Sequence, residues 1–122
     1  MPSEKVLIVD DEKLVRWSLR QKCEEWGYQV SEAENGSDGL RLARNESPDL
    51  VLLDVRLHDM NGLQVLQRLK QAGDARAVIM ITADPQLEDV KQALKQGAYD
   101  FIGKPIDYDE LRGQRVDELR LF

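Results

Sequence analysis

Short apolar runs recur along the chain, and each is followed closely by a polar side chain. Unbroken apolar runs are typical of strands that are buried on both faces of a parallel sheet. In an open parallel sheet the ligand site lies outside the carboxyl ends of the strands. We therefore expect the polar side chains to meet at one edge. The runs are residues 6–9 before Asp10 and Asp11, 50–53 before Asp54, 78–81 before Thr82, and 99–102 before Lys104.

Amphipathic segments separate these runs and predict helices. The first is expected over residues 13–26, where Val15, Leu19 and Cys23 share one face. Strands that alternate with helices predict βαβ units with right-handed crossovers, and so an α/β fold on a mainly parallel sheet. Further predictions are a second helix over residues 37–46, helix N-caps at Asn61, Asp84 and Asp107, and terminal glycines at Gly27, Gly73 and Gly97.

The last predicted helix, which follows Asp107, has the weakest pattern. Its apolar residues Leu111, Val116 and Leu119 are separated by steps of five and then three, and Gly113 lies between them. A glycine inside a helix costs roughly 0.5–1 kcal/mol relative to alanine. We therefore expect this helix to be irregular.

Length and composition favour one globular domain over residues 1–122, with a linker expected to begin after about residue 118. Of the residues, 42% are hydrophobic and 33% charged, and no apolar run approaches the roughly 20 residues of a membrane span. The absence of a signal-peptide pattern and a single cysteine, Cys23, predict a reducing cytoplasmic setting. The net charge of −6 argues against direct contact with nucleic acid.

Three carboxylates at one sheet edge would repel one another. At 4 Å, two such charges repel by about 4 kcal/mol at an effective dielectric of 20. A divalent cation such as Mg²⁺ would relieve the repulsion between Asp10, Asp11 and Asp54, and would leave positions for a phosphate oxygen. Lys104 could add a point charge and Thr82 a hydroxyl. Together these groups can support phosphoryl transfer through an aspartyl-phosphate.

Each of these residues also has a simpler interpretation. Asp10 and Asp11 could cap the first helix, Asp54 could belong to a turn, and Lys104 could be a solvated charge. Their joint placement at strand ends favours the functional interpretation. Cys23 is expected to be a buried packing residue. No cysteine or second histidine lies near His58, which argues against a metal role for this side chain.

The motifs resemble those of response-regulator receiver domains from two-component signalling, over essentially the whole length. They are VLIVDDE at 6–12, AENG at 33–36, PDLVLLDVRLHDMNGL at 48–63, ITA at 81–83 and GAYDFIGKPID at 97–107. The resemblance implies a flavodoxin-like doubly wound (βα)5 fold with strand order 2-1-3-4-5. It implies that Asp54 accepts the phosphoryl group, and that Asp11, Asp54 and the backbone carbonyl of Arg56 bind Mg²⁺, with Asp10 acting through water.

The same resemblance implies the remaining roles. Lys104 and Thr82 would contact the phosphoryl group, and Phe101 would be the aromatic residue that repacks when Thr82 moves. His58 stands where a proline is usual. Because Lys104 must point back toward Asp54 while the chain turns into the next helix, we expect a cis Lys104–Pro105 bond.

The implied function is a phosphorylation-controlled switch rather than a classical enzyme. A sensor histidine kinase would donate the phosphoryl group. The sequence is most similar to receivers of the NtrC type, so the implied output is a sigma-54-activating ATPase with a DNA-binding domain. A receiver homodimer is a further expectation.

Three alternatives remain open: a metal-dependent phosphohydrolase, a flavin-binding electron carrier, and a receiver-like module that is never phosphorylated. A phosphohydrolase would require an acidic residue at the position that Arg56 occupies. A flavin carrier would require a phosphate-binding loop in place of the acidic residues 10–12.

Overall fold

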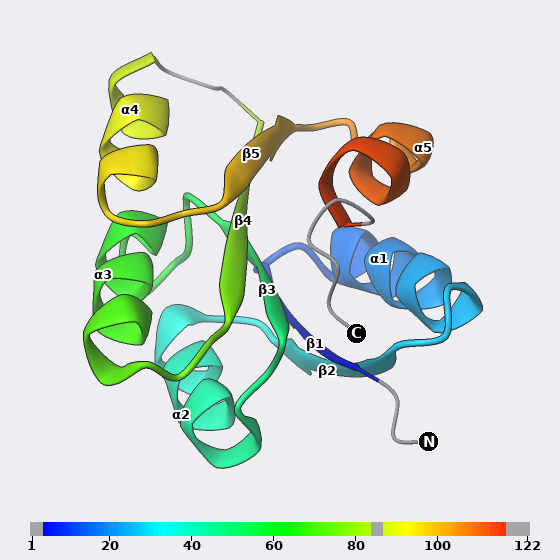
Figure 1. The fold of residues 1–122 in the computed structure, drawn as a ribbon, viewed down its shortest axis with the longest axis horizontal. Coiled ribbons are helices and arrows are strands. Elements are labelled where there is room, and N and C mark those ends of the chain that lie inside the picture. The colour runs from blue at the N-terminus through cyan, green and yellow to red at the C-terminus, as the bar shows by residue number, and fades with distance from the viewer. Residues whose placement is uncertain (1–3, 84–86, 117–122) are drawn as a thin grey trace.

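The computed structural model describes residues 4–83 and 87–116. Five parallel strands form one sheet in the order β2-β1-β3-β4-β5 (Figure 1), which confirms the predicted fold. No helix among these residues is long and apolar enough to cross a membrane. The elements in chain order are β1 (Lys5–Val9), α1 (Lys13–Glu25), β2 (Gln29–Ala33), α2 (Gly36–Glu46), β3 (Leu50–Asp54), α3 (Gly62–Ala72), β4 (Ala77–Thr82), α4 (Leu87–Lys95), β5 (Asp100–Gly103), α5 (Tyr108–Glu110) and the π-helix η1 (Leu111–Val116).

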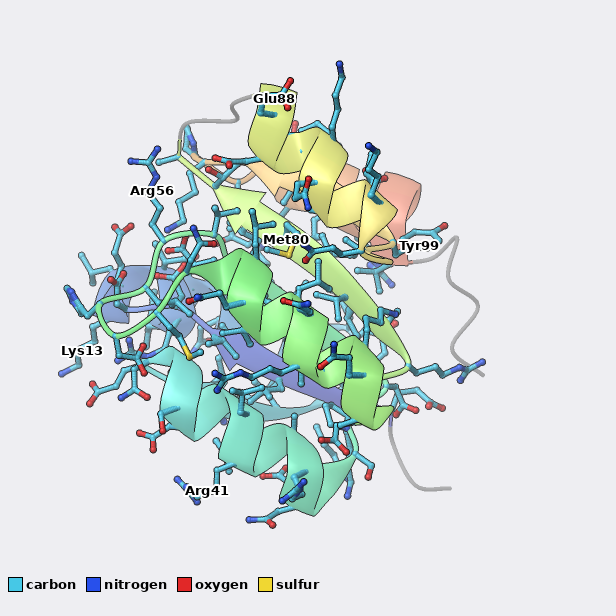
Figure 2. All side chains as sticks on the ribbon, turned by 90° about the vertical axis from the view of Figure 1, so that its left-hand side faces the viewer. Lys13, Arg41, Arg56, Met80, Glu88 and Tyr99 are labelled. Atoms are coloured by element: carbon cyan, nitrogen blue, oxygen red, sulfur yellow. The ribbon has the colours of Figure 1, made fainter. Side chains whose placement is uncertain are left out.

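Helices cover both faces of the sheet. One face carries α1 together with α5 and η1, and the other carries α2, α3 and α4 (Figure 1); Figure 2 views the second layer face on. Strand β3 is fully buried, and its side chains alternate between two cores. Val51 and Leu53 pack under α2 and α3, whereas Leu50 and Leu52 pack under α1 and η1. This double burial explains why the run has no polar residue before Asp54.

The predicted helix boundaries agree with the structure at most positions. Gly27, Gly73 and Gly97 have φ values of 94°, 69° and 100°, which is the left-handed region expected of a glycine after a helix. The side chains of Asn61 and Asp107 accept the hydrogen bonds of N-caps. Helix α2 begins one residue earlier than predicted, at Gly36, because the side chain of Asn35 caps it. The Lys104–Pro105 bond is cis, as predicted. The predicted cap at Asp84 lies outside the described residues.

The irregular end of the chain has a structural explanation. Three α-helical residues, Tyr108–Glu110, are followed by a π-helix, Leu111–Val116. A π-helix makes hydrogen bonds between residues five apart, so side chains five apart face the same way. Leu111 and Val116 are accordingly both buried, with exposed fractions of 0% and 2%. The five-residue step between these two apolar residues matches the hydrogen-bond spacing of this element.

Gly62, the first residue of α3, lies against the backbone of the strand that ends at Asp54. A Cβ atom at this position would overlap the carbonyl oxygen of Asp54 and lie 2.7 Å from Cα of Val55. We expect Gly62→Ala to lower the free energy of unfolding by about 2–3 kcal/mol, because backbone atoms cannot rotate away as a side chain can. Urea unfolding measures this change.

Gly113→Ala is the matched control, since no atom lies within 4 Å of its Cβ position and its φ is not positive. This variant should gain up to about 1 kcal/mol from the lost glycine flexibility. Equal effects of the two substitutions would show that close approach at Gly62 is not what requires a glycine.

Candidate functional site

The predicted convergence of carboxylates occurs at the carboxyl ends of β1 and β3. Val9 pairs with Leu53 in register, so the residues that follow, Asp10 and Asp54, lie side by side. One carboxylate oxygen from each of four residues lies within 4.8 Å of the others: Asp10, Asp11, Glu12 and Asp54. Asp10 and Asp54 are buried, with exposed fractions of 1% and 5%. The sequence interpretation omitted Glu12, although its position directly after the acidic pair was a usable signal.

The ammonium group of Lys104 lies among these carboxylates. Its Nζ atom is 3.0 Å from Asp10 Oδ2, 2.8 Å from Glu12 Oε1 and 3.1 Å from Asp54 Oδ2. Burial alone would lower the pKa of Lys104, but the hydrogen bonds to Glu12 and Asp10 and the nearby negative charges raise it above its usual value. In this structure Lys104 therefore supplies part of the positive charge that the cluster requires.

Backbone groups hold the two buried carboxylates in place. Asp10 Oδ1 accepts a hydrogen bond from the N–H of Glu12 at 2.8 Å, and Asp54 Oδ1 accepts one from the N–H of Arg56 at 3.0 Å. Burial raises the pKa of Asp10, and its bond from Glu12 opposes that shift. The N-cap of α1 is Glu12, whose side chain makes no capping hydrogen bond. Neither Asp10 nor Asp11 is the N-cap residue of α1, so the simple capping interpretation does not account for them.

Thr82 and Phe101 lie on the neighbouring strands β4 and β5. Thr82 ends β4, is 5% exposed, and its carbonyl oxygen accepts the N–H of Lys104 at 2.8 Å. Asp54 pairs in register with Ile81, which places Thr82 one step beyond it. Phe101 pairs with Met80 and packs, half-buried, against the core under α2 and α3. Thr82 thus borders the carboxylate site, and Phe101 lies one strand farther along the sheet.

A cavity of about 270 Å³ opens beside Asp54. It is lined by Asp11, Glu12, Asp54, Arg56, Ala83 and Lys104. Figure 2 shows the Arg56 side chain on the outside of this edge, where it is exposed. Carboxylate oxygens are the hard ligands that Mg²⁺ prefers. Asp10 Oδ2 is buried and lies 3.0 Å from Lys104 Nζ, and the four clustered carboxylates outnumber this one cation. The residues present therefore fit a divalent cation.

The loop between β3 and α3 contains two contacts that the sequence did not predict. His58 Nε2 lies 3.3 Å from Asp11 Oδ2, although the histidine side chain is 81% exposed. Asp59 accepts the N–H of Gly36 at 2.8 Å and that of Ser37 at 2.9 Å, which holds the pKa of Asp59 below its usual value. The loop that leaves Asp54 is thereby tied to the N-terminus of α2.

Repulsion among the carboxylates has a measurable consequence at Asp11, whose side chain is 16% exposed. In metal-free buffer we expect Asp11→Asn to raise the free energy of unfolding by on the order of 1 kcal/mol, because one of several clustered charges is removed. Urea melts of the two proteins in the same metal-free buffer measure this change. In Mg²⁺ the order should invert, because the wild type then gains more from binding. A lower metal-free midpoint would contradict the repulsion argument.

The chain is similar to known proteins over most of its length. The family described as the response regulator receiver domain matches residues 6–115. Sporulation initiation phosphotransferase F of Bacillus subtilis is 38% identical over 112 residues, which cover 92% of this chain and 90% of that protein. The DNA-binding transcriptional regulator NtrC of Escherichia coli is 36% identical over 105 residues, which cover 86% of this chain but only 22% of NtrC.

Solved structures of receiver domains have a fold similar to that of this chain. A CheY-like response regulator receiver domain protein from Methanospirillum hungatei superimposes with a TM-score of 0.91 at 31% identity, and the match covers 97% of this chain and 94% of that one. The agreement therefore extends to almost the whole length of both chains.

Proposed function

The chain belongs to the response regulator receiver domain family, and from that membership we propose that it is a two-component signalling switch phosphorylated on Asp54. The observation that carries the proposal is the position of Asp54. Its carboxylate ends the central strand, is 5% exposed, opens into a cavity, and lies 3.1 Å from Lys104 Nζ. A nucleophilic carboxylate beside a fixed positive charge suits attack on a phosphoryl group.

The proposed metal is Mg²⁺. Asp11, Asp54 and the backbone carbonyl of Arg56 would hold it, and Asp10 would act through a water molecule. When bound, the ion would neutralise charge on the phosphoryl oxygens. The four clustered carboxylates, which outnumber the single ammonium group of Lys104, and the all-oxygen donor set support this assignment.

The proposed reaction moves one phosphoryl group from a phosphohistidine to Asp54. A carboxylate oxygen of Asp54 forms a bond to phosphorus, and the bond between phosphorus and the donor imidazole nitrogen breaks. The imidazole leaves with the electron pair of that bond. Lys104 is already within hydrogen-bonding distance of Asp54 and would pair with the transferred oxygens, which places its positive charge where negative charge arrives.

The proposed output of phosphorylation is a repacking around Thr82 and Phe101. The new phosphoryl oxygens would attract the Thr82 hydroxyl, and its movement would open space next to β5. Phe101 is only half-buried, so it can move between a packed and a more exposed position. Such a change needs the two arrangements to differ by only a few kcal/mol.

The proposed partners follow from the family and from the surface next to the site. Receiver domains partner with histidine kinases. A hollow of about 560 Å³ beside Lys104 and Pro105 is bordered by Leu14, which is 80% exposed and would contact the incoming kinase domain. Because the match covers only 22% of NtrC, an ATPase and DNA-binding output, and a receiver homodimer, are part of the proposal.

Incubation of the whole chain with acetyl phosphate tests the proposed function. With Mg²⁺ we expect the intact mass to rise by one phosphoryl group, and with EDTA we expect no rise, because the carboxylates alone repel the donor. Equal labelling in EDTA would contradict the metal requirement. Continuous phosphate release without a detectable phosphoprotein would instead favour a phosphohydrolase.

A further inference from the structure

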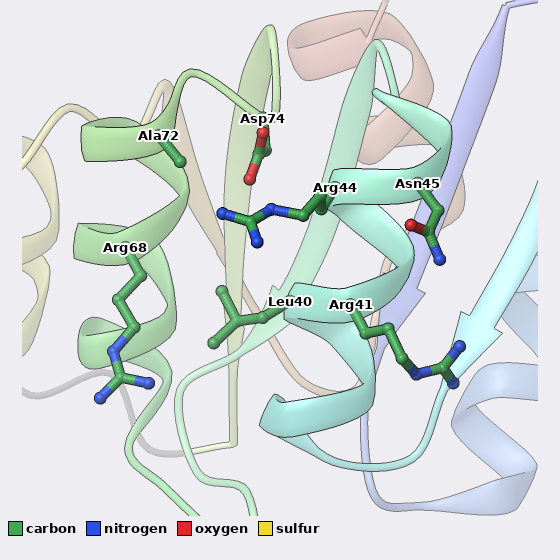
Figure 3. Close-up of a pocket in the computed structure, with 7 residues that line it drawn as sticks. All are labelled: Leu40, Arg41, Arg44, Asn45, Arg68, Ala72 and Asp74. Atoms are coloured by element: carbon green, nitrogen blue, oxygen red, sulfur yellow. The ribbon is translucent and has the colours of Figure 1, made fainter.

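A groove between α2 and α3 lies outside the carboxylate site. Its volume is about 360 Å³, and we name it the α2–α3 groove (Figure 3). It lies toward the C-terminal ends of both helices. Since helices of a parallel α/β sheet run antiparallel to the strands, this is the opposite edge from Asp54. The residues that matter are Leu40, Arg41 and Arg44 of α2, and Arg68, Ala72 and Asp74 from α3 and the turn after it.

The groove is rich in positive charge although the chain as a whole carries −6. Arg41 is 3.5 Å from Asp38, and Figure 3 shows it directed away from α3. Arg44 reaches from α2 toward α3 in the same view, and Arg68 lies on the facing helix. Within residues 4–83 and 87–116, neither Arg44 nor Arg68 has an ion-pair partner within 4.0 Å. Asp74 is the one carboxylate of the lining, so positive charge predominates there.

The floor of the groove is apolar. Figure 3 shows Leu40 between the two helices, with Ala72 on the far wall. A bare phosphate or nucleotide phosphate would leave this floor uncovered. A peptide side chain of the size of leucine could occupy it, while carboxylates on either side reach the two guanidinium groups. Arginine pairs with carboxylates through two parallel hydrogen bonds, so this arrangement favours a carboxylate-bearing chain.

We propose that the α2–α3 groove binds an acidic segment of a partner protein, in which carboxylates flank an apolar side chain. Arg44 and Arg68 hold the carboxylates, and the surface of Leu40 and Ala72 receives the apolar side chain. This contact is separate from phosphorylation at Asp54 and does not depend on it.

Fluorescence anisotropy with a labelled peptide of repeated Glu-Glu-Leu units tests the proposal on the whole chain. We expect the peptide to bind the wild type and Arg44→Gln/Arg68→Gln to lose at least tenfold in affinity. Both arginines are exposed, so the fold should persist, and equal urea midpoints confirm it. The matched control is Lys13→Gln/Lys91→Gln, which removes the same charge outside the groove and should lose less than threefold.

Two changes of probe separate the groove from general charge attraction. A Gln-Gln-Leu peptide should not bind, and a Glu-Glu-Ser peptide should bind several-fold more weakly than the leucine form. The proposal is overturned by no binding of the acidic peptide at millimolar concentration, or by equal losses in the two double variants. It is also overturned if inorganic phosphate competes as strongly as the peptide, since that result would identify a small-anion site.

Discussion

Replacing Asp54 with asparagine is expected to abolish the mass increase that acetyl phosphate and Mg²⁺ produce in the wild type. An amide oxygen lacks the full negative charge of a carboxylate and is a poor nucleophile. The substitution keeps the shape of the side chain, and the amide oxygen can still accept the N–H of Arg56 that Asp54 Oδ1 accepts at 3.0 Å. The expected loss is therefore one of chemistry rather than of fold. Intact-mass spectrometry measures it directly.

The matched control for this experiment lies at the other end of the same strand. Asp49 immediately precedes β3, and its Oδ2 accepts the N–H of Lys5 at 2.8 Å, far from the cavity. Asp49→Asn should be phosphorylated as the wild type is. If Asp54→Asn still gains one phosphoryl group, the acceptor is another residue and the central assignment is wrong.

Replacing Lys104 with methionine is expected to cause the largest loss of stability at the site. The methionine keeps much of the side-chain volume but removes the ammonium group within about 3 Å of three carboxylates. Asp10 and Asp54 would remain buried without their counter-charge. Removing one partner of a buried ion pair typically costs 3–5 kcal/mol, so we expect a loss of roughly 3 kcal/mol in metal-free urea melts. Phosphorylation should also fall sharply.

Two comparisons identify the cause of that loss. Lys95→Met removes an exposed lysine of α4 and should change stability little. Adding Asp54→Asn to Lys104→Met should cost less than the sum of the single changes, because one of the unpaired carboxylates is gone. Added Mg²⁺ should raise the free energy of unfolding of Lys104→Met by more than it raises that of the wild type. A Lys104→Met midpoint equal to that of the wild type would mean that solvent already neutralises the cluster.

The sequence was sufficient for the sheet and for most of the charged residues at its carboxyl edge. Strand β3 has the predicted apolar residues because it is buried on both faces, and it ends on Asp54 where the carboxylates gather. Cap residues such as Asn61 act through hydrogen bonds to residues two or three positions away, so they can be recognised locally. The motifs around Asp10, Asp54 and Lys104 identified the family for the same reason.

The last helix shows where local interpretation reaches its limit. The irregular spacing of Leu111 and Val116 predicted a departure from a regular α-helix, which the structure confirms. That departure takes the form of a π-helix because both side chains must face the core under α1 at once. Packing against another element, rather than local propensity, selects the period of this segment.

The tertiary structure alone decided several contacts between distant residues. Lys104 was expected to point toward Asp54, 50 residues away, but its pairing with Glu12, 92 residues away, was not predicted. The carboxylates were expected to need a metal ion, and the structure adds that a lysine already provides part of the charge. Likewise, Asp59 holds the N-terminus of α2 from 23 residues away, and Arg44 and Arg68 line one groove from two helices. The sequence by itself determined which polar residues lie at the strand ends, because periodicity and capping act between near neighbours. The direction and partners of those side chains depend on how the packed helices and strands place distant parts of the backbone, which no local pattern encodes.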